Sequence, residues 1–311
     1  MPDAAGPAGS GPAAGPRHAD PDDTPARALP RLGHRARHRD RSTRPGPLVR
    51  GGLLALVLAA LVVAAALVPR LTGAPPGEAG TAAPPPTAGE PGTPAAWLSA
   101  ALPPTTDLAA ADAVREELSA SGVPPDRLRP AGAGVASGSL LAVTGAAPPD
   151  SRVVARFDRP GGGELLVVDP RPGEPTAEQL ERRRSLAEAL LANPTTGAGP
   201  EAADVLRSGE VDLRLLSLLA ALAAREGVGV AAFPVLPGEE GAATPARRVL
   251  LDAVGGAAVP DDPAAADRLR AWLAAQRPPF RPDDVQVTDD GVLVSFRYAP
   301  DPDALVADAT R

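Results

Sequence analysis

The sequence predicts a domain of the α/β or α+β class outside the cytoplasm, behind one transmembrane helix and a disordered N-terminal tail. Three observations predict this organisation. Residues 1–50 carry many charges without apolar periodicity, residues 51–69 form one uncharged apolar run, and helix-like and strand-like patterns alternate from residue 95 onward. With 311 residues, the chain is longer than a single domain of about 150 residues requires.

The first 50 residues are basic and lack a candidate core. They contain nine Arg, five Asp and all three His of the chain, which gives a net charge of +4. Because so few apolar residues recur at helical or strand spacing, burial cannot offset the entropy lost on ordering them. We expect residues 1–50 to be a disordered cytoplasmic tail.

Residues 51–69 are the candidate membrane span. These 19 residues hold Gly, Leu, Ala, Val and one terminal Pro, and as a helix they would reach about 28 Å. A buried helix of a soluble protein would need apolar contacts on every face. A cleaved signal peptide would have a shorter apolar region and a leader of far fewer than 50 residues. We therefore expect an uncleaved signal anchor that contacts the lipid bilayer.

The arginines around this span predict its orientation. Several precede it closely, whereas Arg70 alone follows it closely, so the N-terminus should be cytoplasmic and the rest of the chain extracytoplasmic. Residues 71–311 carry a net charge of −12. Such an acidic balance argues against a general nucleic-acid binder, whose surface is basic.

Residues 70–94 form a linker rich in Pro, Gly and Ala. The triplet Pro84–Pro86, together with Pro75, Pro76, Pro91 and Pro94, favours an extended polyproline-like spacer. A Pro-rich docking site is the alternative for this stretch.

Residues 95–175 are expected to form a first α/β module. Pro-Pro and Gly-Pro breakers separate short periodic segments. The predicted helices are Ala96–Leu102 and Asp112–Ser121, and the predicted strands are Asp107–Ala109, Leu140–Thr144, Val153–Phe157 and Leu165–Val168.

Residues 176–300 are expected to form a second α/β module. Its first helix begins at Thr176, which makes a capping box with Gln179, and ends before Asn193-Pro194. The next helices are Glu201–Ser208 and Asp212–Arg225, followed by strands Val228–Phe233 and Arg248–Val254 and a helix from Asp262 to about Gln276. The apolar core of Asp212–Arg225 is too short to span a membrane and predicts a buried helix.

A β-hairpin is expected to close the second module. Asp290-Gly291 has the signature of a type I′ turn, which would place Val287 opposite Val294 and Val285 opposite Phe296. Residues 301–311, which follow Pro300, are expected to be a flexible C-terminal tail.

One internal similarity raises the question of duplication. Residues 96–104 and 271–279 share six of nine residues, including both tryptophans, Trp97 and Trp272. A duplicated module would explain this. The alternative is that Ala-rich helices ending in Pro-Pro recur through composition alone. Under both interpretations each Trp is expected to anchor a core.

The residue types absent after the span exclude several chemistries. That part of the chain has no His, Lys or Cys, so it cannot build a Ser-His-Asp triad, a Walker A loop or a zinc site with His or Cys ligands. Carboxylate chemistry, arginine clamps and oxygen-ligated cations remain. The sequence therefore predicts no catalytic, cofactor-binding or metal-binding residues and no cofactor.

Several fragments have a functional and a structural interpretation. Gly132–Ser137 begins like a dinucleotide-binding loop, but it lacks the third glycine and predicts a surface loop. Arg182–Arg184 predicts an exposed helix face rather than a phosphate clamp. Adjacent acids predict solvated turns and caps rather than the opposed pair of a glycosidase. These acid pairs are Glu116-Glu117, Glu239-Glu240, Asp261-Asp262, Asp283-Asp284 and Asp289-Asp290.

About 50 to 75 residues of the first module resemble a known group of proteins. The similar positions are Trp97-Leu98, Leu102–Pro104, Asp107-Leu108, Asp112, Glu117-Leu118, Gly122–Pro124 and Arg127-Leu128. This stretch resembles the soluble extracytoplasmic tails of some actinobacterial membrane glycosyltransferases and of uncharacterised actinobacterial single-pass membrane proteins. The multi-span body that holds the transferase acids is missing here, so the resemblance implies a module without its enzyme.

These observations give three functional hypotheses. The first is a non-enzymatic, membrane-anchored domain that binds an envelope protein or a glycan. The second is a carboxylate-dependent enzyme that processes cell-envelope glycans, which would need two acids facing each other across a cleft. The third places the function in the basic cytoplasmic tail, which would dock anionic lipid or a cytoplasmic partner.

Overall fold

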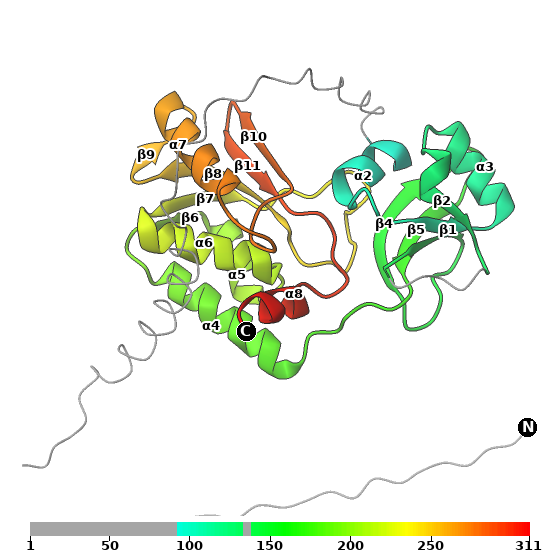
Figure 1. The fold of residues 1–311 in the computed structure, drawn as a ribbon, viewed down its shortest axis with the longest axis horizontal. Helices are drawn as coiled ribbons and strands as arrows, with labels where there is room; N and C mark the ends of the chain where they lie inside the picture. Colours follow the sequence, from blue (N-terminus) through cyan, green and yellow to red (C-terminus); the bar gives the residue numbers. More distant parts are fainter. Residues whose placement is uncertain (1–91, 133–137) are drawn as a thin grey trace, which may run out of the picture. The chain divides into compact units, whose positions relative to one another are not determined.

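The structure is a computed structural model that describes residues 92–132 and 138–311 (Figure 1). This part of the chain contains seven α-helices and two mixed β-sheets, which confirms the predicted mixture of helices and strands. The predictions for residues 1–50 and 51–69, and for nearly all of 70–94, lie outside the described residues. Within them, no helix has the length and apolar character needed to cross a membrane.

The first sheet contains five strands in the order β2-β1-β3-β5-β4. β1 is parallel to β2 and β3, whereas β5 is antiparallel to β3 and β4. Their bounds are β1 Leu108–Ala110, β2 Leu128–Pro130, β3 Leu140–Thr144, β4 Arg152–Asp158 and β5 Glu164–Asp169. The predicted strands of this module are confirmed to within one residue at each end, and β2 is an addition to them.

Helices α2 (Pro94–Ala101) and α3 (Asp112–Ala120) bury apolar residues against the first sheet. A short 3₁₀ helix, η1 (Pro125–Arg127), leads into β2. Trp97 is 3% exposed and its ring meets that of Phe157 edge to face, with centroids 5.8 Å apart. Trp97 is therefore a core anchor, as predicted.

The second sheet contains six strands: five follow the order β10-β11-β8-β7-β6, and β9 pairs with β8 beside this path. β6 and β7 are parallel, and the remaining neighbours are antiparallel. The bounds are β6 Thr196–Ala198, β7 Val228–Ala232, β8 Arg248–Val254, β9 Ala257–Ala258, β10 Asp284–Thr288 and β11 Gly291–Ser295.

Helices α4 (Ala177–Leu191), α5 (Pro200–Ser208) and α6 (Leu213–Arg225) pack together and against this sheet (Figure 1). The predicted capping box is confirmed, because Thr176 accepts from the Gln179 backbone N–H and the Gln179 side chain accepts from that of Thr176. α6 is buried around most of its circumference, which confirms that it is a core helix. Helix α7 (Pro263–Ala274) adds Leu269 and Leu273 to the same core.

The register of the hairpin differs from the prediction by two residues. Val285 pairs with Val294 and Val287 with Val292, so the turn residues are Asp289-Asp290. A shift of two keeps each side chain on its predicted face, since side chains alternate along a strand. Gly291 has a φ of +146°, and a Cβ there would lie 2.2 Å from the Leu251 carbonyl oxygen. A glycine is therefore required here because β8 lies too close for a side chain, whereas the prediction placed Gly291 in the turn.

The expectation of a loose C-terminal tail is wrong for Pro302–Ala309, which form helix α8. Asp301 caps this helix by accepting from the Ala304 N–H, and Pro302 occupies its first turn. Pro302, Asp303 and Val306 are buried. The same Asp-Pro start predicted α7 correctly from Asp262-Pro263, so the signal was present in the sequence.

Topology places the two similar nine-residue stretches differently. The first begins in α2, which precedes β1, a strand parallel to both of its neighbours. The second begins in α7, which precedes the antiparallel β10–β11 hairpin. Trp97 is buried, and Trp272 packs half-buried against the second core. The two sheets also differ in strand order, so a shared origin of the modules is not shown.

Segments from the second module contact the first through what we call the inter-sheet network. Its members are Trp97 and Asp169 from the first module, and Glu239, Arg247 and Tyr298 from the second. The loop after β7 also covers the outer edge of β4, because the Arg156 N–H donates to the Gly238 carbonyl at 2.7 Å. Tyr298 lies in the first core, and its N–H donates to the Ala101 carbonyl.

Candidate functional site

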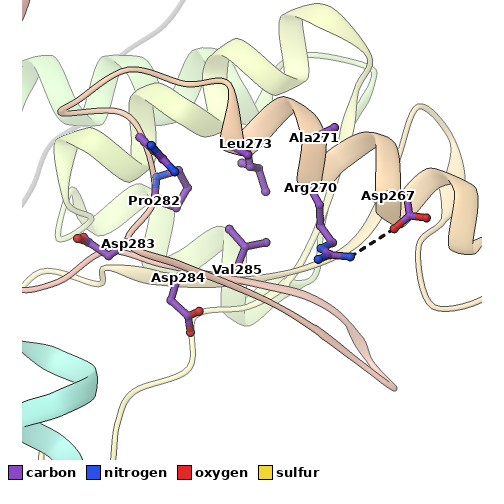
Figure 2. A pocket seen from close by; sticks show the side chains of 10 residues that line it. Asp267, Arg270, Ala271, Leu273, Pro282, Asp283, Asp284 and Val285 are labelled. Atoms are coloured by element: carbon purple, nitrogen blue, oxygen red, sulfur yellow. Dashed lines mark hydrogen bonds and ion pairs between the residues drawn. The ribbon is translucent and has the colours of Figure 1, made fainter. Parts of the chain in front are cut away.

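An open groove lies between α7 and β10, and we call it the α7–β10 groove (Figure 2). Its volume is about 450 Å³. The lining residues from α7 are Asp267, Arg270, Ala271, Leu273 and Ala274, and those from β10 and the segment before it are Arg281, Pro282, Asp283, Asp284 and Val285.

One face of α7 forms a wall of this groove. Asp267, Arg270, Ala271 and Ala274 follow the spacing i, i+3, i+4, i+7, which places them along one side of a helix, and all four are exposed. The two alanines leave space between the longer side chains. Pro263 fixes the first turn of α7, and the buried Leu269 and Leu273 fix its rotation against the core.

The floor of the groove is apolar. Leu273 and Val285 point toward one another in Figure 2, one from the helix and one from the strand. Leu273 is fully buried, whereas Val285 is only partly buried against the second core. The core therefore reaches the surface at this point.

β10 borders the groove as an outer strand. Among the strands that the structure describes, it pairs with β11 alone. Val287 is 52% exposed, although its neighbours Val292 and Val294 across the hairpin are fully buried. The helical layer therefore covers Val285 in part but leaves Val287 uncovered.

Some charged side chains of the groove have a partner within the chain, and one forms no ion pair in the described part of it. Arg270 pairs with Asp267 at 3.4 Å, and Asp283 accepts from the Arg297 backbone N–H at 2.8 Å. Asp284 accepts from the Gln286 side chain. Arg281 forms no ion pair within the described residues. The acid pair Asp289-Asp290 is exposed at the hairpin tip beyond the other end of β10.

A second cavity of about 570 Å³ lies among segments of both modules. Its lining includes Arg152, Arg156, Arg183, Glu174 and Glu210. The most buried of these cations are already paired within the chain: Arg183 with Asp303, and Arg152 with Glu174 at 2.7 Å. This neutralisation makes the second cavity a weaker candidate for a charged ligand than its composition implies.

The arginine run on α4 does not form one exposed face. Arg182 is exposed and pairs at 3.0 Å with Glu178, one turn earlier on the helix. Arg183 instead is 2% exposed and forms two hydrogen bonds with the carboxylate of Asp303 on α8. The prediction of an exposed face is therefore wrong for Arg183, because α8 covers it.

The acids of these pairs are exposed or partly exposed, as predicted, except for one that is buried. Glu239 is 6% exposed, and it accepts from the Trp97 indole Nε1 at 2.6 Å and from the Arg247 guanidinium. Arg247 also lies over the ring of Tyr298, 5.9 Å from its centroid. The expectation of a solvated acid is wrong for Glu239, since the loop that carries it packs against the first module.

Tyr298 completes the inter-sheet network. Its hydroxyl donates to Asp169 at 2.7 Å. Burial, followed by this hydrogen bond, raises the pKa of Tyr298 far above its ordinary value of 10.0. The phenol therefore stays protonated and holds a fixed hydrogen bond between the modules.

Residues 133–137, which include most of the glycine-rich fragment Gly132–Ser137, lie outside the described part of the chain. Sequence reasoning missed the α7–β10 groove, because Arg270, Arg281 and Asp284 become neighbours only through the packing of α7 on the sheet. The sequence showed only two signals of the groove: the acid pair Asp283-Asp284, and the Asp262-Pro263 start of α7.

Comparison with known proteins adds no relative: no family model matches the chain, and no curated protein or solved structure is significantly similar to it.

Proposed function

We propose that this chain is a single-pass membrane protein whose described region is a non-enzymatic, extracytoplasmic domain that binds an envelope protein. Residues 51–69 would anchor it in the bilayer, with the tail 1–50 in the cytoplasm. The observation that carries the binding function is the α7–β10 groove, whose apolar floor opens beside an outer strand.

The strand edge favours a protein partner over a glycan. A polypeptide has N–H and C=O groups at the spacing of a β-ladder, so it can extend a sheet at its edge. A glycan lacks this regular pattern. None of the ten residues that line the groove is aromatic, so a sugar ring would find no aromatic face there.

A carboxylate-dependent glycan-processing enzyme is the second candidate, and the same groove favours it. Asp267 lines the groove from α7, while Asp283 and Asp284 line it from the strand side. A glycosidase needs two carboxylates on opposite sides of the scissile bond. Reproducible turnover of envelope glycan by the purified full-length chain, lost in Asp267→Asn, would establish this function and refute the non-enzymatic proposal.

The binding proposal is tested by photo-crosslinking in living cells. A photoreactive residue replaces Val287, which lies on β10 two residues after the groove-lining Val285. The matched control replaces Val235, which is similarly exposed at 56% but lies in the loop after β7. We expect a discrete crosslinked protein from position 287 and none from position 235. Equal patterns from both positions, or crosslinks confined to a probe in residues 1–50, would refute a groove-bound partner. The second result would move the function to the tail.

A further inference from the structure

We infer that the partner of the α7–β10 groove is an extended peptide segment that adds to β10 as a further strand and carries basic residues at both ends of its apolar centre. This inference rests on the proposed function, because it names the chemistry of the partner at the same site.

β4 and β10 are two of the four outer strands of the sheets, and their edges differ in protection. β4 has its edge occupied, since the Arg156 N–H donates to the Gly238 carbonyl of the loop after β7. β10 pairs only with β11 among the described strands. Exposed strand edges are templates for pairing, and proteins usually shield them with charges, bulges or covering loops. β10 instead presents a half-exposed valine, Val287.

The groove supplies the second half of a strand-docking site. In peptide binding by strand addition, the ladder provides affinity and pockets for alternate side chains provide specificity. Here the partly exposed Val285 supplies the apolar floor between the helix and the strand, and the fully buried Leu273 lies beneath it. A peptide lying along β10 would place alternate side chains over that floor.

The charges around β10 specify the ends of the peptide. Asp283-Asp284 lies at one end of the strand and Asp289-Asp290 at the other, and all four residues are exposed. Arg270 is neutralised by Asp267, so two cations are set against these four acids: Arg281 in the groove, and Arg248, whose charge interacts with that of Asp284. The net charge around β10 is therefore negative, as is the net charge of −12 for residues 71–311. Basic residues flanking a short apolar centre complement this arrangement.

The alternative is that the four aspartates only protect the edge from other strands. The two readings predict opposite results when Asp289 and Asp290 are changed to Asn. Under the inference, the variant binds basic-flanked peptide more weakly. Under the protective reading, the variant self-associates, and its peptide binding does not change.

The test uses a library of heptapeptides with a fixed Val-Thr-Val centre and randomised flanks, applied to the immobilised full-length chain at low salt. We expect the retained peptides to be enriched in Lys and Arg at both flanks. Asp289→Asn with Asp290→Asn should lower retention roughly five-fold, because two exposed ion pairs are lost. The control is Asp126→Asn with Asp308→Asn, which removes the same charge from exposed residues that neither belong to β10 nor flank it.

A second pair of variants tests the strand edge itself. Val287→Lys should abolish retention, because it places a cation on the edge and removes an apolar contact, whereas Val235→Lys should not. Loss of retention should also follow N-methylation of the peptide backbone. Retention without basic enrichment, or retention that survives Val287→Lys, overturns the inference.

Self-association gives another refuting outcome. If the unmodified chain forms dimers that Val287→Lys dissolves, a second copy occupies the edge in place of a peptide. If a protein crosslinks at position 287 in cells but the library shows no basic preference, the proposed function stands and the inference about the peptide fails. If no protein crosslinks there, both fail.

Discussion

The indole Nε1 of Trp97 donates a hydrogen bond of 2.6 Å to Oε1 of Glu239, although 142 residues separate them in the chain. Trp97 belongs to α2, which precedes the first sheet in the sequence. Glu239 belongs to the loop that follows β7 of the second sheet. Arg247 bonds the same carboxylate oxygen. This buried group therefore holds the loop of one module against the core of the other.

Replacing Glu239 should destabilise the fold strongly. Glu239→Ala leaves the buried Arg247 without its carboxylate, and breaking a buried pair of this kind lowers the free energy of unfolding by about 3–5 kcal/mol. The matched control is Glu240→Ala at the exposed neighbour, which should change it by about 0.5 kcal/mol or less. Urea unfolding of the full-length chain, followed by circular dichroism, measures both. Equal stability of the two variants would show that the Glu239 carboxylate contributes nothing.

Helix α8 should be an integral part of the second module. Asp303→Ala leaves the guanidinium of Arg183 buried and unpaired, so we expect a loss of about 3–5 kcal/mol in the free energy of unfolding. Asp308→Ala removes a carboxylate from the same helix, where its contact with Arg311 is exposed, and serves as the control. Equal urea midpoints for Asp303→Ala and Asp308→Ala would contradict a structural role for α8.

The close approach at Gly291 should make that position intolerant of any side chain. Gly291→Ala would place a Cβ 2.2 Å from the Leu251 carbonyl oxygen. Gly256 also has a positive φ, of +77°, but its Cβ would meet nothing within 4 Å, so Gly256→Ala isolates the backbone strain. We expect Gly291→Ala to be less stable than this control by about 2 kcal/mol. Similar urea midpoints for both variants would place the turn back at Asp290-Gly291.

The ion pair between Glu117 and Arg159 should give a pH-dependent contribution to stability. Hydrogen bonds from Arg159, at 3.0 and 2.7 Å, hold the pKa of Glu117 below its ordinary value of 4.5. A carboxyl group whose pKa falls on folding stabilises the fold above its unfolded pKa and loses that effect as the pH falls through its folded pKa.

We therefore expect Glu117→Gln to lower the urea midpoint at about pH 7, and this difference from the unmodified chain to shrink as the pH falls below about 4.5. Glu116→Gln changes the exposed neighbouring acid and should leave the midpoint unchanged at both pH values. A difference for Glu117→Gln that persists in acid would mean that packing, not charge, causes it.

Local signals predicted most elements because the interactions that define them are local. The Thr176–Gln179 capping box lies within one turn, and the Asp262-Pro263 start fixes a helix end through a single side chain. The apolar run Leu140–Thr144 was sufficient to locate β3. The C-terminal helix had the same Asp-Pro signal and was missed because its position at the chain end favoured a loose tail.

Burial of charges could not be predicted, because it depends on contacts between distant residues. Arg183 and Asp303 are 120 residues apart, and neither segment shows by itself that the other will cover it. Glu239 has the same local context as its exposed neighbour Glu240. The α7–β10 groove also requires the packing of α7 against the sheet, so composition indicated acids and arginines but not their arrangement.

The placement of the folded region outside the cytoplasm is the claim on which the proposed function depends. The chain has no Cys, so single cysteines can be introduced at Asp126, which is exposed, and at Ser10 in the basic tail. Intact cells are treated with a membrane-impermeant maleimide. The account predicts labelling of Asp126→Cys in intact cells and of Ser10→Cys only after permeabilisation, whereas the reverse pattern, or no labelling at either position before permeabilisation, would contradict it.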